Sequence, residues 1–279
     1  MITKNYINKD ILNKKKIRKF SIDVKKVFNN VIKSIHDPRK TLHVLSNNYR
    51  FNFNLNELRK FKKFKSIAII GMGGSTLGAE AIYNFLGKKI KKKFYFFNDL
   101  DIKKILDFEK KVNLNKTLFF IISKSGGTTE TLSNTFSINI IKKNAKNVIL
   151  ISERKNNFLY ALSKKNNLFY IEHKNSIGGR FSVLSEVGIV PAFLMGVNIF
   201  KLRSKTLKFL KGKSKIFLES SCIKLSDLLC SRKINNLIFI NYVPELDKFL
   251  FWSQQLIAES LGKKGKGFLP MVSNAPKDH

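Results

Sequence analysis

Five short, continuous apolar runs constrain the fold of this chain more than any other feature of its sequence. Each run is four or five residues long and rich in β-branched or aromatic residues, which is typical of β-strands. Continuous rather than alternating apolar residues indicate strands buried on both faces, as in parallel sheets. Most runs are separated by enough chain for a helix, so the sequence predicts a doubly wound parallel α/β sheet. The runs are Ile67–Ile70, Phe94–Phe97, Leu118–Ile122, Val148–Ile151 and Leu168–Ile171.

The segments on either side of these runs predict further elements. Residues 1–48 are polar and basic, with apolar residues at helical spacing, and predict a helical N-terminal extension. Beyond about Leu210 the pattern predicts a helix over Lys215–Lys233, then a buried strand at Leu237–Ile240. A long helix from Glu245 to about Lys263 follows, with no further strand after it.

These elements divide the chain into three parts. The parallel sheet with its helices accounts for a first domain at residues 49–212, after the extension at residues 1–48. The strand and helix that follow cannot cover both faces of another parallel sheet. Residues 213–279 are therefore expected to be the start of a second domain that is incomplete.

The net charge of +34 is the feature of the composition that most needs interpretation. Such a charge ordinarily indicates nucleic acid or an anionic membrane as a partner. Here the lysines are spread along the whole chain, and Lys, Asn, Ile and Phe are abundant together, as A/T-rich codons produce. We interpret the lysines as a solvated surface that would steer anionic substrates, and expect neither nucleic acid nor membrane as a partner. A basic nucleic-acid binder is the alternative.

The two cysteines and the polarity of the N-terminus bear on the cell compartment. Cys222 and Cys230 lie too far apart for a CxxC pair and have no His/Cys cluster nearby, so we expect free thiols. Residues 1–18 lack the apolar core of a secretory signal, and no apolar stretch approaches the roughly 18 residues that span a bilayer. A cytoplasmic protein is expected.

A glycine-rich loop follows the first apolar run. Gly71–Gly78 (Gly-Met-Gly-Gly-Ser-Thr-Leu-Gly) comes directly after Ile67–Ile70, where ligands bind in parallel α/β sheets. Its glycines let the backbone approach a ligand, and the next helix offers unpaired N–H groups to an anion. Thr76 occupies the place of the last glycine in the dinucleotide fingerprint, and Ala79 the place of the P-loop lysine. The loop therefore fits neither nucleotide motif.

A hydroxyl-rich loop follows the third apolar run. Ser123–Thr131 (Ser-Lys-Ser-Gly-Gly-Thr-Thr-Glu-Thr) combines hydroxyls, one lysine and the start of a predicted helix. Hydroxyls and a helix N-terminus can bind phosphate without a metal. Ser123, Ser125 and Thr128 can donate to phosphate oxygens, and Lys124 supplies positive charge. A Ser/Thr helix cap alone would explain only one or two of these residues.

At four motifs the chain resembles the sugar isomerase (SIS) domain, and within it the glucose-6-phosphate isomerase family. The two loops match this family's Gly-Gly-Ser turn and phosphate loop, and both further motifs occur in family order. These are Gly178–Ser182 (Gly-Gly-Arg-Phe-Ser) and Gln255–Lys263 (Gln-x-x-x-Glu-Ser-x-Gly-Lys). The resemblance implies a flavodoxin-like SIS sheet at residues 49–212 and the start of a second SIS domain at residues 213–279.

The resemblance also implies a reaction and a role for each matching residue. Members interconvert glucose 6-phosphate and fructose 6-phosphate through a cis-enediol, in glycolysis and gluconeogenesis, and the complete proteins are homodimers. Glu259 would be the catalytic base and Arg180 would stabilise the enediolate. The residues implied in substrate binding are Gly74, Ser75, Ser123, Lys124, Ser125, Thr128 and Gln255.

This reaction needs one carboxylate that removes and returns a carbon-bound proton, and a fixed cation where oxygen charge develops. We therefore expect no cofactor and no metal. His173, which ends a predicted strand, is assigned to structure.

The C-terminal end departs from the family's pattern. Members are longer, and their Lys-Asp-[Gln/Asn]-His-Ser segment carries a histidine that assists ring opening. Here the chain reads Pro276-Lys-Asp-His279, so His279 occupies the Gln/Asn position by spacing. A one-residue deletion would instead make His279 the ring-opening histidine. We expect a truncated isomerase with weak or no activity of its own, the alternative being an SIS regulator that binds phosphosugars without turnover.

Overall fold

The computed structural model describes residue 12 and residues 14–231 and 234–278. It divides into two compact units. We call Arg50–Ile199 with Val243–Gln255 the sheet unit, and Met1–Tyr49 with Phe200–Tyr242 and Leu256–His279 the terminal unit. Among the described residues, no helix is both long and apolar enough to cross a bilayer.

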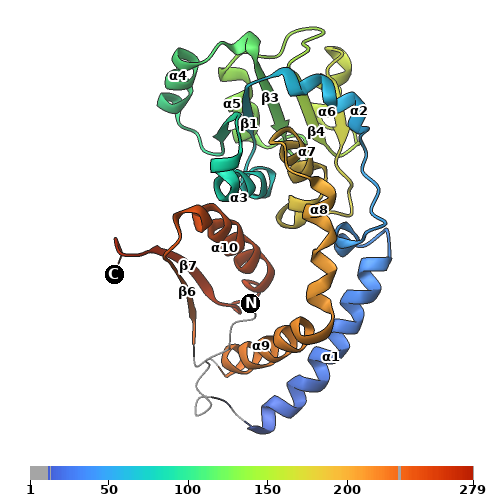
Figure 1. Ribbon diagram of the computed structural model, residues 1–279, viewed down its shortest axis with the longest axis vertical. Coiled ribbons are helices and arrows are strands. Elements are labelled where there is room, and N and C mark those ends of the chain that lie inside the picture. The colour runs from blue at the N-terminus through green and yellow to red at the C-terminus, as the bar shows by residue number, and fades with distance from the viewer. Residues whose placement is uncertain (1–11, 13, 232–233, 279) are drawn as a thin grey trace. The chain divides into compact units, whose positions relative to one another are not determined.

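The sheet unit is built on a five-stranded parallel sheet in the order β2-β1-β3-β4-β5 (Figure 1). This order is that of a doubly wound, flavodoxin-like sheet, as the apolar runs predict. The three central strands are buried along almost their whole length, whereas the outer two are partly exposed. The strands are β1 (Ser66–Ile70), β2 (Lys93–Phe97), β3 (Thr117–Ile122), β4 (Val148–Ser152) and β5 (Phe169–Glu172).

Two apolar clusters cover the two faces of this sheet. Successive residues of β1 point to opposite faces, so Ile67 and Ile69 join one cluster and Ala68 and Ile70 join the other. The first cluster receives side chains from α2, α3 and α7, and the second from α4 and α6. The helices of this unit are α2 (Leu55–Arg59), α3 (Leu77–Leu86), α4 (Ile102–Lys111), α5 (Thr129–Ser137), α6 (Phe158–Lys165) and α7 (Glu186–Leu194).

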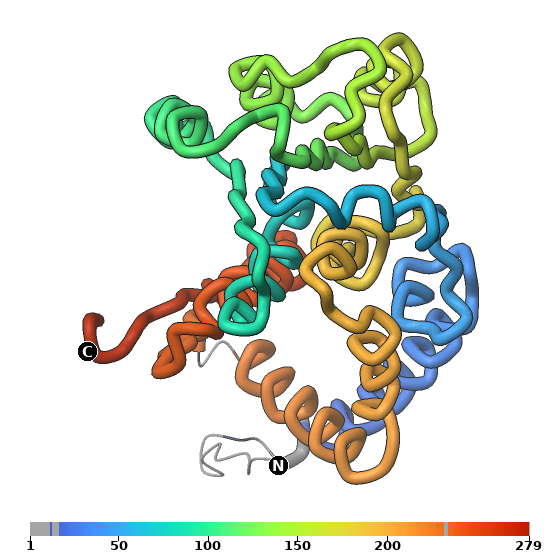
Figure 2. The backbone as a smooth tube through the Cα atoms, turned by 45° about the horizontal axis from the view of Figure 1, so that its top comes forward, coloured from blue at the N-terminus to red at the C-terminus, as the bar shows by residue number. Residues whose placement is uncertain are grey.

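The terminal unit contains α1 (Lys14–His36), which confirms the predicted N-terminal helix, and α9 (Gly212–Cys230). These helices pack against each other, blue and orange in Figures 1 and 2. The Arg203 guanidinium of α8 (Ile199–Ser204) donates to the carbonyl oxygens of Val44 and Ser46, at 2.8 and 3.0 Å, and so fixes the turn after α1. Cys222 and Cys230 are free and exposed.

The C-terminal part contains one strand that the sequence pattern missed. The predicted strand and helix are present as β6 (Asn236–Asn241) and α10 (Asp247–Leu261), and β7 (Leu269–Asn274) then pairs with β6 in parallel. The expectation that this strand is buried was wrong, because Asn241 is its only buried residue. The expectation of no further strand was wrong. Pro270 argues against a strand in sequence, because proline cannot donate to a ladder. β7 has a described partner on one side only, so proline is tolerated there.

Candidate active site

The two loops singled out in the sequence follow neighbouring strands. β1 and β3 pair directly, with Ile70 opposite Ile121, so the loop after β1 and the loop after β3 begin side by side. The chain continues from β1 to β2 on one side and from β3 to β4 on the other. This is the point where the strand order reverses, and ligands of open α/β sheets bind at that point.

The first loop turns tightly across the end of β3. A Cβ atom at Gly71 would lie 2.7 Å from the carbonyl oxygen of Ile122, so only glycine fits there. Gly73 has a φ of +51° and begins a 3₁₀ turn over Gly73–Ser75 that leads into α3. This turn presents Gly74 and Ser75, both expected to line the sugar, at the carboxyl edge of the sheet.

The Gly-Gly-Arg segment packs directly on this loop. A Cβ atom at Gly74 would lie 2.3 Å from the carbonyl oxygen of Gly179 and 2.9 Å from the amide nitrogen of Arg180. The Ser182 hydroxyl donates to the Gly74 carbonyl oxygen at 2.8 Å. The structure thus brings together Gly74, Ser75 and Arg180 from segments about a hundred residues apart. The Arg180 guanidinium lies 4.8 Å from the centroid of the Phe181 ring.

The second loop gathers three hydroxyls. Ser123 is buried at the end of β3, and its Oγ lies 2.8 Å from Thr128 Oγ1 and 3.4 Å from Ser125 Oγ. The Gly126 amide donates to Ser123 Oγ at 3.1 Å, which holds the turn closed. Ser123, Ser125 and Thr128, predicted as phosphate ligands, therefore form one cluster.

This cluster sits at the start of α5. Thr128 is the N-cap residue, yet its side chain makes no capping hydrogen bond to the helix. The first amides of a helix carry partial positive charge and attract anions. Gly126 has a φ of +71°, and a Cβ atom there would lie 1.9 Å from Asn157 Oδ1, so this conformation of the loop requires glycine. Hydroxyls and helix amides converge as phosphate binding requires.

Lys124 is held by partners that sequence reasoning missed. Its ammonium donates to the Asn175 carbonyl oxygen at 2.9 Å and lies 3.4 Å from Glu153 Oε1. Glu153 follows β4 and also pairs with Lys155 at 2.9 Å. Burial raises the pKa of Glu153, but its bonds to Lys155 and Lys124 outweigh burial, so the pKa lies below its usual value. Its place after a neighbouring strand was the signal that could have identified Glu153.

His173 lies next to this ion pair and is buried. Its Nε2 lies 3.2 Å from the Ile177 carbonyl oxygen, and its Nδ1 has no partner among the described residues. Burial, and to a lesser extent the charge of Lys124, lowers the pKa of His173 to about 4. The imidazole is therefore neutral at neutral pH and has the structural place that the sequence assigned to it.

His173 should make the stability of the chain fall as the pH drops from 6.5 to about 4. In that window the unfolded chain protonates its histidine (pKa 6.5), whereas the folded chain does not until about pH 4. The lost stability amounts to about 3 kcal/mol. Urea unfolding at pH 7, 5.5 and 4.5 should show a smaller fall for His173→Gln, whose amide can still donate to Ile177. Equal falls in both proteins would contradict the assignment, because the carboxylates contribute equally to each.

The remaining predicted residues lie on α10. A Cβ atom at Gly73 would lie 2.6 Å from Gln255 Nε2, so the Gln255 amide packs against the first loop within the sheet unit. Glu259 is exposed, lies four residues later on α10, and belongs to the terminal unit.

His279 lies outside the described residues. Within the described part, no group of three or more His, Cys, Asp or Glu residues could hold a metal ion.

Comparison with known proteins gives one consistent result. The sequence matches the family model described as phosphoglucose isomerase over residues 57–267. A glucose-6-phosphate isomerase of Methanocaldococcus jannaschii is 32% identical over 238 residues, which cover 82% of this chain and 58% of that protein. The chain spans about half the length of the curated relatives it matches.

Solved structures agree with the fold. A hypothetical protein from Thermus thermophilus superposes with a TM-score of 0.74 at 23% identity, over 94% of this chain and 66% of that one. A glucose-6-phosphate isomerase from Chlamydia trachomatis superposes with a TM-score of 0.58, also at 23% identity, over 80% of this chain and 48% of that one.

Proposed function

The chain belongs to the phosphoglucose isomerase family, and we propose that the protein of which it forms part interconverts glucose 6-phosphate and fructose 6-phosphate. The observation that carries this proposal is the hydroxyl cluster at the start of α5, which follows the strand next to β1. The cluster suits a phosphate, and the loop after β1, with the Gly179–Arg180 segment packed on it, would contact the sugar through Ser75 and Arg180.

In this proposal the phosphate is bound by Ser123, Ser125, Thr128 and Lys124. Hydroxyl and amide donors to a charged oxygen are worth about 1.5–3 kcal/mol each. The bonds of Lys124 to Glu153 and Asn175 keep its ammonium in one orientation near the loop. A phosphate group held in this way would anchor the substrate while the carbon chain reacts several bonds away.

Glu259 then moves the proton, Arg180 stabilises charge and Gln255 contacts the substrate. The Glu259 carboxylate takes the proton from C2 of the open-chain aldose, the C–H electrons form the C1–C2 double bond, and the carbonyl oxygen becomes an enediolate. The Arg180 guanidinium stabilises that oxygen. The O2 hydroxyl proton passes to O1, and return of the first proton from Glu259 to C1 then gives the ketose. Support for Glu259 comes from helix register, because it lies one turn after Gln255 on the same face of α10.

Three further features of the complete protein belong to the same proposal. Residues 213–279 are the start of a second SIS domain, which the parallel pairing of β6 with β7 supports. The complete protein is a homodimer. It is cytoplasmic, in keeping with exposed free cysteines in the terminal unit.

A double substitution in the phosphate loop tests the proposal. Ser123→Ala with Thr128→Ala should weaken fructose 6-phosphate binding about 100-fold or more, since two donors to a charged group are lost. Calorimetry on the chain measures this change, and fructose without phosphate should show no difference between variant and parent. The control, Ser133→Ala with Ser137→Ala, removes two exposed hydroxyls of α5 and should leave the affinity unchanged.

Unchanged affinity in the loop variant would mean that the phosphate binds elsewhere. If the complete protein binds the phosphosugar through this loop but shows no turnover, it is a regulator rather than an isomerase.

A further inference from the structure

Four of the five strands of the sheet unit have a lysine at their first residue or within two residues before it. Lys93 is the first residue of β2, and Lys65 and Lys116 directly precede β1 and β3. Lys146 lies two residues before β4. Parallel strands begin at the same edge of a sheet, so the topology collects these lysines at the edge opposite the phosphosugar loops.

The strand register aligns them closely. Ser66 pairs with Lys93 on one side and with Thr117 on the other, so Lys65 lies between Lys92 and Lys116. The Lys93 amide donates to the Lys65 carbonyl oxygen at 3.0 Å, which fixes this alignment. Four strands cover three strand spacings, about 14 Å of sheet edge. The pairing of the strands therefore brings these lysines into a row. The high lysine content of the chain alone would not do so.

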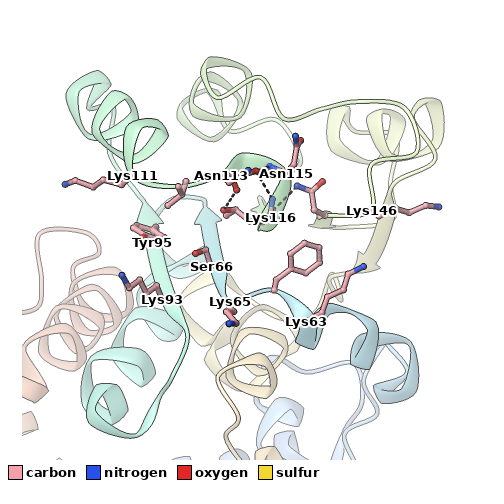
Figure 3. Close-up of a pocket in the computed structure, with 14 residues that line it drawn as sticks. Lys63, Lys65, Ser66, Lys93, Tyr95, Lys111, Asn113, Asn115, Lys116 and Lys146 are labelled. Atoms are coloured by element: carbon pink, nitrogen blue, oxygen red, sulfur yellow. Dashed lines mark hydrogen bonds between the residues drawn. The ribbon is translucent and has the colours of Figure 1, made fainter.

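A hollow of about 720 Å³ opens at this edge, and six lysines line it. No aspartate or glutamate is among its lining residues. Figure 3 shows Lys111 and Lys146 on opposite sides of the hollow, with Lys93, Lys65 and Lys63 along a third side. None of the six ammonium groups pairs with a carboxylate in the described part of the chain.

Two asparagine side chains between the lysines are already engaged in the fold. Asn113 Oδ1 accepts from the amides of Asn115 and Lys116 at 2.9 and 3.2 Å. The Asn147 amide donates to the carbonyl oxygens of Leu114 and Thr117 at 3.0 and 2.8 Å. The charged groups that the hollow offers to a ligand are therefore all positive, and the ligand that suits them is an anion.

Lys92 does not line the hollow, but it lies beside it on the same edge of the sheet and shows the effect of crowded lysines. Lys92 donates to the Lys62 carbonyl oxygen at 2.7 Å. Burial lowers the pKa of Lys92, and the charge of Lys62 lowers it further. The six lysines that line the hollow are also close together, and an anion bound there would relieve the repulsion among them.

We propose that the hollow lined by Lys63, Lys65, Lys93, Lys111, Lys116 and Lys146 binds an oligophosphate, an anion of two or more linked phosphates. The spread of the lysines over four strand starts favours several linked charges over a single phosphate. Lysine ammonium groups act as point charges and suit phosphate chains. The volume falls within the usual range for small-ligand pockets, roughly 300–1,000 Å³.

The proposal is independent of the isomerase function, because it uses none of the residues of the phosphosugar loops. Free tripolyphosphate and the phosphate tail of a nucleoside triphosphate share this chemistry. Their relative affinities identify the source: equal binding indicates recognition of the phosphate chain alone, and tighter ATP binding indicates added contacts to the nucleoside.

The test is calorimetric titration of the chain with tripolyphosphate and with ATP, both without metal. Lys65→Gln, Lys93→Gln and Lys116→Gln combined should raise the Kd about tenfold or more. The matched control, Lys19→Gln, Lys25→Gln and Lys26→Gln on α1, removes the same charge from exposed lysines and should change the Kd less than about twofold. Thermal unfolding checks that both variants are folded.

Two further measurements distinguish binding in the hollow from binding at the phosphosugar site. Saturating fructose 6-phosphate and the Ser123→Ala, Thr128→Ala variant should both leave tripolyphosphate binding intact. The triple variant made with arginine, Lys65→Arg, Lys93→Arg and Lys116→Arg, keeps the charge and should retain tripolyphosphate binding.

Three outcomes would overturn the proposal. Equal weakening in the α1 control would show attraction by net charge only. Loss of binding in the phosphate-loop variant would place the anion in the phosphosugar site. Binding of a single-stranded oligonucleotide through the same lysines, with none of tripolyphosphate, would identify a nucleic-acid surface instead.

Discussion

Glu259→Gln should lower the kcat of the complete protein about 1,000-fold while the KM for fructose 6-phosphate changes little. A general base contributes about 10²–10⁴-fold to rate, and glutamine keeps the size of glutamate without its basicity. The measurement is coupled-assay kinetics in both directions, together with exchange of the C2 proton of the substrate with solvent. Loss of exchange assigns the missing step to proton removal.

The control for this substitution is Glu245→Gln, which removes the same charge just before α10. Glu245 pairs with exposed Lys88 at 3.1 Å, and such a surface ion pair contributes little. The control should keep its kcat within about twofold of the parent. A Glu259→Gln protein that retains a tenth of the parent kcat or more would show that another group is the base.

Gly74→Ala should destabilise the chain by about 2–3 kcal/mol and weaken fructose 6-phosphate binding as well. The added Cβ atom would lie 2.3 Å from the Gly179 carbonyl oxygen, so the two backbone segments must separate. Arg180 directly follows Gly179. Moving Gly179 away from the loop should therefore move Arg180 as well and disturb the sugar site. Urea unfolding and calorimetry measure the two effects.

Gly127→Ala is the matched control, since an added Cβ atom there meets nothing within 4 Å. Its unfolding free energy should stay within about 0.5 kcal/mol of the parent. If Gly74→Ala proves as mild as Gly127→Ala, the contact between the two segments is looser than the structure indicates.

The sheet could be predicted from the sequence because its pattern is local. Buried parallel strands require continuous apolar runs, and β1, β3 and β4 retain that signal in full. β7 could not be predicted, because Pro270 interrupts its pattern and only its pairing with β6 makes it a strand. The division at residues 48 and 212 stays a prediction.

The candidate site was predicted only in part. The motifs identify Ser123, Thr128 and Gly74, since glycine and hydroxyl patterns are local. Motifs cannot show that Gly179 meets Gly74, or that Glu153 orients Lys124, because those contacts join distant segments. The lysine row has the same origin: composition explains the number of lysines, whereas strand register places them together.

The steric demands of the loops bear on how this sequence has evolved. Four glycines at 71–78, two at 123–131 and two at 178–182 make up eight of the chain's 15 glycines. Every glycine codon begins with two G bases, so a mutational drift toward A and T tends to remove glycines. Gly71, Gly74 and Gly126 lie where any Cβ atom would collide with a neighbour. Their presence in so A/T-biased a composition indicates that selection has maintained the geometry of these loops against the direction of mutation.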